Sequence, residues 1–342
     1  MTTAYVYDPI YLEHKMYGHP ESPERLLTAL RALGEAGVLA RLTHVEASPI
    51  AMEHLAAVHD RAYIERVRRM AESGGGHLDL DTYLSPRSYE AALMAAGGLV
   101  RAVRAVLEGQ ADNAFALVRP PGHHALPNRG MGFCLFNNVA IAARYALDQH
   151  GLERVLIADF DVHHGNGTQA IFYDDSRVLY FSTHQYPYYP GTGHWREIGE
   201  GEGEGYTVNV PLPAGVGDEG YETIFGEILR PLAERYRPQL ILVSAGYDAH
   251  WADPLAAMRL SITGYAQLAR ALRSLADELC QGRLIFALEG GYNLEVLSHS
   301  ILATFRVLLG EENIADPLGP SPRPSRPIDD LIATIKGVHR LA

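Results

Sequence analysis

The segment V-L-I-A-D-F-D-V-H-H-G-N-G-T, residues 155–168, decides the fold. Its first four residues are apolar, which is typical of a strand buried on both faces in a parallel sheet. Asp159, Asp161 and His163 follow at alternate positions, so on an extended backbone their side chains point the same way. A glycine-rich turn comes next. A buried strand that ends in acids and histidines is typical of α/β enzymes, which bind ligands at the carboxyl end of the sheet.

Three more predicted strands end in polar motifs. The motifs are R-P-P-G-H-H-A (119–125), S-A-G-Y-D-A-H (244–250) and L-E-G-G-Y-N (288–293). Further strands are predicted at 4–7, 178–182 and 207–210. Helices are predicted at 87–108, 137–150, 218–236, 263–280 and 295–309, and a polar loop at 77–86. Strands that alternate with helices indicate an α/β fold, a parallel sheet with helices on both faces.

Length and composition are those of a soluble globular protein. The chain has 342 residues and a formal net charge of -12, which argues against nucleic acid as a direct partner. We find no signal peptide and no apolar run of the ~20 residues that a membrane span needs, so a cytoplasmic location is expected. We predict a single domain, 1–342, in which a Pro-rich connection (317–327) precedes a short helix (328–335) that packs on the body.

The carboxyl ends of parallel strands lie along one edge of a sheet, so the four motifs can converge there. Asp248 is then a candidate third ligand beside Asp161 and His163. Two carboxylates and one imidazole suit zinc, and three protein ligands leave room for substrate, as at a catalytic site. His123 and His124 are candidates for general acid–base catalysis. Tyr292 follows two glycines and could donate a hydrogen bond to a developing oxyanion.

Together the four motifs resemble the zinc-dependent histone deacetylase family, which includes acetylpolyamine amidohydrolases. The resemblance extends from H-P-E-S-P-E-R (19–25) to L-E-G-G-Y (288–292), most of the chain. It implies the arginase–deacetylase fold, with an eight-stranded parallel sheet between helices. It also implies zinc-dependent hydrolysis of N-acetyl amides, most simply of acetyl-lysine side chains with release of acetate. The substrate partner would be an acetylated lysine or acetylated amine, and a homo-oligomer is compatible with the resemblance.

The resemblance also implies a role for each matching residue. Asp161, His163 and Asp248 would hold one zinc ion. His124 matches the general base, and Asn166 matches its partner, a position where the class II-like branch carries asparagine. His123 matches a second, more cationic histidine paired with Asp159, and Tyr292 matches the oxyanion donor. A structural potassium ion would bind Asp159, Asp161, His163, Ser182 and the carbonyl groups of Phe160 and Thr183.

Other matches concern the substrate tunnel. Gly132 and Phe133 match one wall, and Tyr189 matches the other, where phenylalanine is commoner in the family. Asp81 matches a rim position that holds the substrate backbone, and Arg25 matches a buried arginine near the acetate pocket. Leu255 stands where polyamine-selective members carry an acidic residue, which favours lysine deacetylation. We expect His164 to be a packed residue outside the chemistry and His184 to be a loop histidine.

Three alternatives remain open. The nearest is hydrolysis of acetylpolyamines, other small amides or longer acyl groups. A second is the related ureohydrolases, which use two manganese ions and need further carboxylates after D-x-H. His164 and Gly165 occupy those positions here. A third is a catalytically silent binding module, which in this family often lacks the tyrosine that Tyr292 supplies.

Overall fold

The computed structural model describes residues 2–342. Its main sheet has eight strands, and every neighbouring pair is parallel. This confirms the predicted α/β fold and its eight-stranded parallel sheet. Across the sheet the strands are β2 (Thr43–His44), β1 (Thr3–Val6), β5 (Asn113–Ala116), β10 (Leu284–Leu288), β9 (Leu240–Ala245), β6 (Val155–Asp159), β7 (Val178–Gln185) and β8 (Thr207–Leu212).

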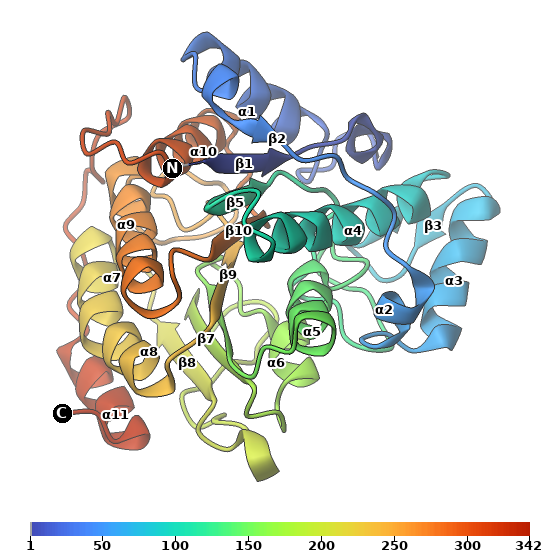
Figure 1. Cartoon of the computed structure of the whole chain (residues 1–342). Helices are drawn as coiled ribbons and strands as arrows, with labels where there is room; N and C mark the ends of the chain where they lie inside the picture. Colours follow the sequence, from blue (N-terminus) through green and yellow to red (C-terminus); the bar gives the residue numbers. More distant parts are fainter. Residues whose placement is uncertain (1) are drawn as a thin grey trace.

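Helices cover both faces of this sheet (Figure 1). One layer contains α1 (Glu24–Glu35), α7 (Asp218–Ile224), α8 (Arg230–Tyr236), α9 (Ile262–Leu279) and α10 (Leu294–Leu308). The other contains α2 (Met52–Ala56), α3 (Arg61–Glu72), α4 (Ser88–Leu107), α5 (Asn138–His150) and α6 (Asn166–Ile171). No helix of residues 2–342 combines the length and the apolar character that crossing a membrane requires.

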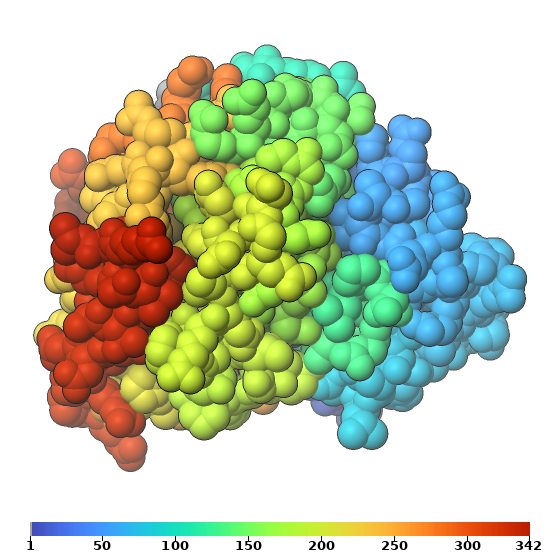
Figure 2. All heavy atoms as spheres, turned by 90° about the horizontal axis from the view of Figure 1, so that it is seen from below, coloured from blue at the N-terminus to red at the C-terminus, as the bar shows by residue number. Residues whose placement is uncertain are grey.

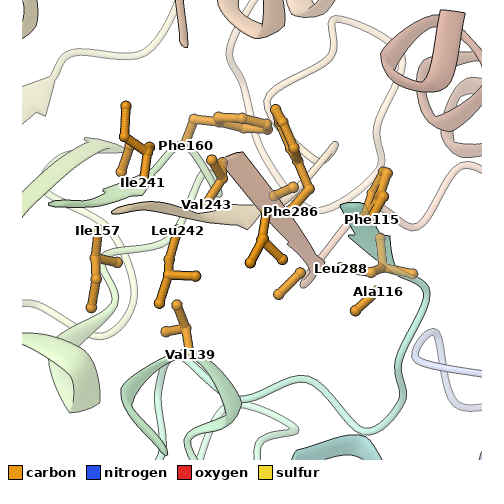
Figure 3. Close-up of a cluster of buried hydrophobic side chains, with 14 of the residues drawn as sticks. Phe115, Ala116, Val139, Ile157, Phe160, Ile241, Leu242, Val243, Phe286 and Leu288 are labelled. Carbon is orange, nitrogen blue, oxygen red and sulfur yellow. The ribbon is translucent and has the colours of Figure 1, made fainter. Parts of the chain in front are cut away.

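The core lies between the sheet and the two helical layers. In β9, Ile241 and Val243 point to one face and Leu242 to the other, where Val139 of α5 meets it (Figure 3). On the opposite face the rings of Phe160 and Phe286 lie 6.5 Å apart between their centroids. Both faces of the sheet are therefore buried, which is why the sequences of these strands are continuously apolar and do not alternate between apolar and polar residues.

The strands that carry the four polar motifs are neighbours in the sheet, in the order β5-β10-β9-β6. They come from distant parts of the sequence, because the chain runs outward to β1 and β2 on one side and to β7 and β8 on the other. Crossovers of this kind open a crevice beyond the carboxyl ends of the central strands. The sheet therefore brings the motifs to one place.

Two segments differ from the prediction. The predicted polar loop at 77–86 overlaps a short antiparallel hairpin of β3 (Gly76–His77) and β4 (Tyr83–Leu84), whose two-residue strands are too short to show a period in sequence. The helix expected over 218–236 is interrupted by a π-helical turn, Phe225–Leu229. Pro231 explains the interruption, because its ring would clash with the carbonyl group of Glu227 in a regular α-helix.

The C-terminal helix α11 (Asp329–His339) follows the Pro-rich connection and is longer than the predicted 328–335. It packs against the π-helical turn and β8, and Ile332 and Ile335 are buried there. The space-filling view shows this red segment against the yellow-green part of the chain (Figure 2). The helix therefore packs against this side of the molecule.

Candidate active site

Asp161, His163 and Asp248 come together beyond the ends of β6 and β9. Each offers one ligand atom, and the three atoms lie within 4.8 Å of one another. His163 Nδ1 lies 3.2 Å from Asp161 Oδ1 and 3.3 Å from Asp248 Oδ2. Backbone N–H groups hold the other two carboxylate oxygens: Gly290 donates to Asp161 Oδ2 (2.8 Å) and Val162 to Asp248 Oδ1 (2.9 Å).

These three residues fit a metal ion. Asp248 Oδ2 is buried and accepts no hydrogen bond, although an unsatisfied buried carboxylate oxygen is costly. Burial opposes a charge on His163, but Asp161 and Asp248 outweigh it and raise the pKa of this imidazole to about 10. The two carboxylates thus favour a positive charge between them, which a divalent cation would supply.

A second group of possible ligands, His123, Cys134 and Glu289, also lies within 4.8 Å. It suits a metal poorly. Burial raises the pKa of the Cys134 thiol well above its usual value, so the thiolate that binds metals does not form readily. His123 is already engaged by Asp159. The geometry therefore favours one metal ion, at Asp161, His163 and Asp248.

The histidine pair lies beside the candidate metal ligands. His123 and His124 follow β5, and their ring centroids are 4.0 Å apart. His123 Nδ1 donates to Asp159 Oδ2 (3.0 Å), and His124 Nδ1 donates to the Asn166 amide oxygen (2.8 Å). Each imidazole is thus oriented by a different partner, one a carboxylate and the other a neutral amide.

The two imidazoles have opposite electrostatics. Burial lowers the pKa of His123, but the charges of Asp159, Asp161 and Glu289 outweigh it and raise this pKa to about 10. Burial and the neighbouring His123 and His163 hold the pKa of His124 well below its usual range. The surroundings therefore favour the cationic form of His123 and the neutral form of His124, which can accept a proton.

Tyr292 lies on the loop after β10, behind Gly290 and Gly291. The Arg25 guanidinium packs over its ring at 5.2 Å, and Arg25 Nε donates to the Gly291 carbonyl group (2.8 Å). Burial and the charge of Asp248 raise the pKa of the Tyr292 phenol well above its usual value. The phenol therefore keeps its proton and remains a hydrogen-bond donor.

A cavity of about 240 Å³ opens onto these groups. Phe133 and Tyr189 line it; the Phe133 ring packs edge-on against Tyr292 (5.8 Å), and the Tyr189 ring against His124 (5.3 Å). A Cβ on Gly132 would lie 2.3 Å from His124, so only glycine lets the chain pass this closely. Further lining residues are Asp81, Pro121, His123, Cys134, His163, Tyr188, Leu255 and Gly290.

Of the sequence-predicted potassium ligands, Asp159 ends β6 and Ser182 and Thr183 lie on β7, while Phe160, Asp161 and His163 follow β6. Asp159 is paired in register with Ser182 between β6 and β7. Asp159 Oδ1 accepts from the Asp161 N–H (3.2 Å), and the Ser182 hydroxyl is 2.9 Å from His184 Nδ1. The sheet thus brings these side chains close to the zinc-ligand candidates.

Some residues lie where the sequence analysis did not place them. His184 is a buried residue of β7 rather than a loop histidine. It was missed because the strand extends three residues beyond the predicted end at residue 182, into polar residues. His164, as expected, is packed: its ring bonds Thr192 (2.7 Å) and Gln169 (2.9 Å). Arg25, which matches a buried arginine in the family, is fully buried behind Tyr292, and it is not among the residues that line the cavity.

Glu289 and Tyr180 were not predicted as site residues. Glu289 accepts from the N–H groups of Gly122 (2.7 Å) and His123 (3.2 Å), so it fixes the backbone of the histidine pair. Burial raises its pKa to about 7. The Tyr180 hydroxyl donates to Asp159 Oδ2 (3.1 Å). A polar residue directly after a buried strand was the available signal for Glu289; Tyr180, inside an apolar strand, had none.

Comparison with known proteins agrees with this geometry. The model of the histone deacetylase domain family matches residues 19–308. A probable deacetylase of Archaeoglobus fulgidus is 46% identical over 298 residues, covering 86% of this chain and 82% of that protein. A histone deacetylase-like amidohydrolase of Pseudomonas aeruginosa is 43% identical over 305 residues, which cover 88% of this chain and 80% of that protein.

Among solved structures, the crystal structure of the HDA15 HD domain superposes with a TM-score of 0.89 at 37% sequence identity. The match covers 98% of this chain and 95% of that one. The family match spans the four polar motifs, and the structural match covers nearly all of the chain. The chain therefore belongs to the histone deacetylase family.

Proposed function

We propose that this protein is a zinc-dependent deacetylase that hydrolyses N-acetyl-lysine side chains and releases acetate. The observation that carries the proposal is a single Asp-His-Asp set next to a cavity lined by aromatic rings. A neutral histidine and a protonated tyrosine lie beside it. Family membership supports a deacetylase or amidohydrolase activity, and the cavity supplies the argument for the substrate.

Asp161, His163 and Asp248 would hold the zinc ion, whose chemistry here is to polarise the amide carbonyl and acidify water. A structural potassium ion held by Asp159, Asp161, His163, Ser182 and the carbonyl groups of Phe160 and Thr183 is part of the proposal. We also propose that residues 1–342 form one deacetylase domain. A cytoplasmic location is proposed as well, since both cysteines are free and buried, which suits a reducing compartment.

The side chains of this protein would divide the proton transfers between them. His124 is neutral, so it can take a proton from the attacking water and pass it to the leaving amine. Asn166 fixes the His124 tautomer by accepting from Nδ1, which leaves Nε2 as the base. His123 contributes positive charge beside the reacting carbonyl group. Tyr292 would donate to the oxyanion, an interaction that strengthens as negative charge develops.

The cavity favours a linear aliphatic amine. Phe133 and Tyr189 would hold the methylene stem of lysine between flat apolar surfaces. Leu255 adds an apolar contact where an acid would attract a polyamine. Asp81, at the rim, could accept hydrogen bonds from the backbone of a peptide substrate. Acetylpolyamine, small-amide or longer-acyl hydrolysis is the alternative.

The decisive experiment compares rates on an acetyl-lysine peptide, acetylspermidine and a longer acyl-lysine peptide. We expect the acetyl-lysine peptide to have the highest kcat/KM, because the cavity matches its apolar stem and short acyl group. A higher kcat/KM for acetylspermidine would overturn the lysine proposal. Leu255→Glu supplies a matched test, since a carboxylate at this position should shift preference toward acetylspermidine.

Metal analysis tests the other half of the proposal. We expect about one zinc ion per chain, since one Asp-His-Asp set is available. Asp248→Ala should lose it, because a buried ligand cannot be replaced by a methyl group. Two tightly bound manganese ions would instead indicate ureohydrolase chemistry.

A further inference from the structure

Asp253 lies outside the motifs from which the site was assembled, yet it joins two of the loops that form it. It follows β9 and is 6% exposed. Its Oδ2 accepts from the backbone N–H groups of Tyr292 (2.7 Å) and Asn293 (3.1 Å), on the loop after β10. Its Oδ1 accepts from the N–H of Leu255 (3.0 Å), which lines the cavity. One carboxylate therefore connects the loop of Tyr292 to the wall beside it.

The loop of Tyr292 needs such a contact. Gly290 and Gly291 directly precede the tyrosine, and Gly291 has a φ of +111°, a conformation open chiefly to glycine. Two glycines restrict the backbone little, so external contacts must fix the direction of the phenol. Arg25 holds the Gly291 carbonyl group on one side. Asp253 holds the next two N–H groups on the other.

Further hydrogen bonds connect the segment of Asp253 to the start of α10 and to the cavity wall. Asn293 donates from its side chain to the Ala252 carbonyl group (3.0 Å), next to Asp253 in sequence. The Asn293 amide oxygen also caps α10, accepting from the N–H groups of Glu295 and Val296 (both 3.2 Å). On the cavity side, Tyr188 donates to the Leu255 carbonyl group (2.7 Å). The carboxylate thus lies between a helix start and the cavity wall.

The chemistry of Asp253 differs from that of an ordinary structural ion pair. Burial and the neighbouring charge of Asp248 raise the pKa of Asp253 to about 7. Within residues 2–342, the groups that favour its ionised form against these effects are backbone N–H groups rather than a cationic side chain. Hydrogen bonds from neutral donors to a buried carboxylate are charge-assisted, shorter and stronger than neutral pairs. In Asp253→Asn, one carboxylate oxygen becomes an NH2 group, which would face backbone N–H donors and could not accept hydrogen bonds from them.

We propose that Asp253 is a positioning residue for Tyr292 and holds the phenol where it can donate to the oxyanion. The expected loss of rate rests on the proposed deacetylase function. The expected movement of the Tyr292 loop rests on the contacts of Asp253 alone. Loss of the hydrogen bonds from the Tyr292 and Asn293 N–H groups to Asp253 should let the Tyr292 loop move. A displacement of about 1 Å at a catalytic group can cost on the order of 10²-fold in rate.

A double-mutant cycle tests the proposal in the zinc-loaded, full-length protein. Asp253→Asn should lower kcat on acetyl-lysine peptide by about 10- to 100-fold, with KM changed less than about threefold and zinc content unchanged. In the Tyr292→Phe background it should lower kcat less than about twofold, because the donor it positions is gone. Equal losses in both backgrounds would overturn the proposal, as would full activity of Asp253→Asn.

Asp316→Asn is the matched control. Asp316 also accepts backbone N–H groups from two segments, at Ile262 (3.1 Å) and at Leu318 and Gly319 (3.0 and 2.8 Å). None of these residues lines the cavity. This variant should keep its kcat. If Asp253→Asn does not fold, Asp253→Glu, which keeps the charge but displaces it, takes its place in the same cycle.

Hydrogen–deuterium exchange separates failure of this proposal from failure of the proposed function. In Asp253→Asn, the amides of Tyr292 and Asn293 should exchange faster than in the native chain and in Asp316→Asn. If the native, zinc-loaded protein turns over none of the substrates, the proposed function is wrong. The exchange result still shows whether Asp253 fixes the backbone of Tyr292 and Asn293. Unchanged exchange at these two amides would overturn the proposal.

Discussion

His123 and His124 are adjacent in sequence and nearly in ring contact, yet their protonation differs because their surroundings differ. Asp159 stabilises the imidazolium of His123, whereas the hydrogen-bond partner of His124 Nδ1 is the neutral amide of Asn166, and burial and two neighbouring histidines lower the pKa of His124. Environments that push two pKa values apart are how one site holds both an acid and a base. The asparagine is therefore a determinant of which histidine stays neutral.

Asn166→Asp tests this determinant. A carboxylate hydrogen-bonded to His124 Nδ1 would favour the imidazolium and raise its pKa. Because the base must be neutral, the acid limb of the kcat/KM–pH profile should move to higher pH. The measurement is the pH–rate profile on acetyl-lysine peptide, with zinc content as the control. An unmoved acid limb would show that His124 is not the base.

Tyr292→Phe removes the proposed oxyanion donor while keeping the ring that packs against Phe133 and Arg25. We expect kcat to fall on the order of 10²–10³-fold, the usual cost of losing one such donor. Metal content should hold, since the phenol is not among the Asp161, His163 and Asp248 ligand set. Near-normal turnover would rule out this role.

At the scale of elements, α4 shows why small residues matter. This helix is rich in alanine and glycine, which allow close packing. Gly97 faces the backbone of the segment before α2: a Cβ there would lie 1.8 Å from the Ser48 carbonyl oxygen. The neighbouring Gly98 meets Tyr11 and Val6, on the side of β1. The helix is therefore packed closely on two sides.

Gly97→Ala should destabilise the protein, because backbone atoms cannot move aside as a flexible side chain can. Overpacking of this kind typically costs about 1–3 kcal/mol in free energy of unfolding. Gly34→Ala in α1 is the control, since its Cβ would meet nothing within 4 Å. Alanine there should stabilise the helix slightly. Denaturant unfolding of both variants checks the pair, and equal stabilities would contradict the close approach.

At the scale of the whole molecule, Glu21 joins distant parts of the chain. This fully buried carboxylate pairs with Arg25 of α1 and with Arg119 at the end of β5. Arg119 also donates to the carbonyl groups of Tyr11 (2.8 Å) and His14 (2.9 Å). Burial alone would raise the pKa of Glu21, but the two arginines outweigh it and lower this pKa to about 2.

Because the folded pKa of Glu21 lies below its ordinary value of 4.5, its contribution to stability is present above pH 4.5. It is lost as the pH falls from 4.5 toward 2. Glu21→Gln should therefore lower the free energy of unfolding at pH 7 by about 3–5 kcal/mol, as expected when a buried pair loses one partner. The difference from the native protein should shrink in acid.

Denaturant unfolding at a series of pH values measures this difference. Glu65→Gln is the control, since Glu65 pairs with Arg68 and Arg69 at the surface of α3, where ion pairs contribute little. This variant should keep nearly native stability at every pH. A pH-independent loss for Glu21→Gln would mean that packing, rather than charge, explains its effect.

Much of the fold could be predicted from local pattern. Buried parallel strands are continuous apolar runs, and helices repeat at 3.6 residues, so Val155–Asp159 and Ser88–Leu107 are visible in the sequence. The two-residue strands and the π-helical turn are not, because they lack a full period. The residues of the candidate site were visible because they cluster at strand ends, where chemistry concentrates in α/β proteins.

The sequence by itself determined the alternating order of elements, the family and the identity of the polar side chains at four strand ends. Only the tertiary structure decided which of them meet and in what charge state. Asp248 reaches His163, Asp159 and Asn166 take different histidines, and Asp253 holds the backbone of Tyr292. The reason is physical: pKa shifts and backbone contacts depend on distance and burial in space, which spacing along the chain does not specify.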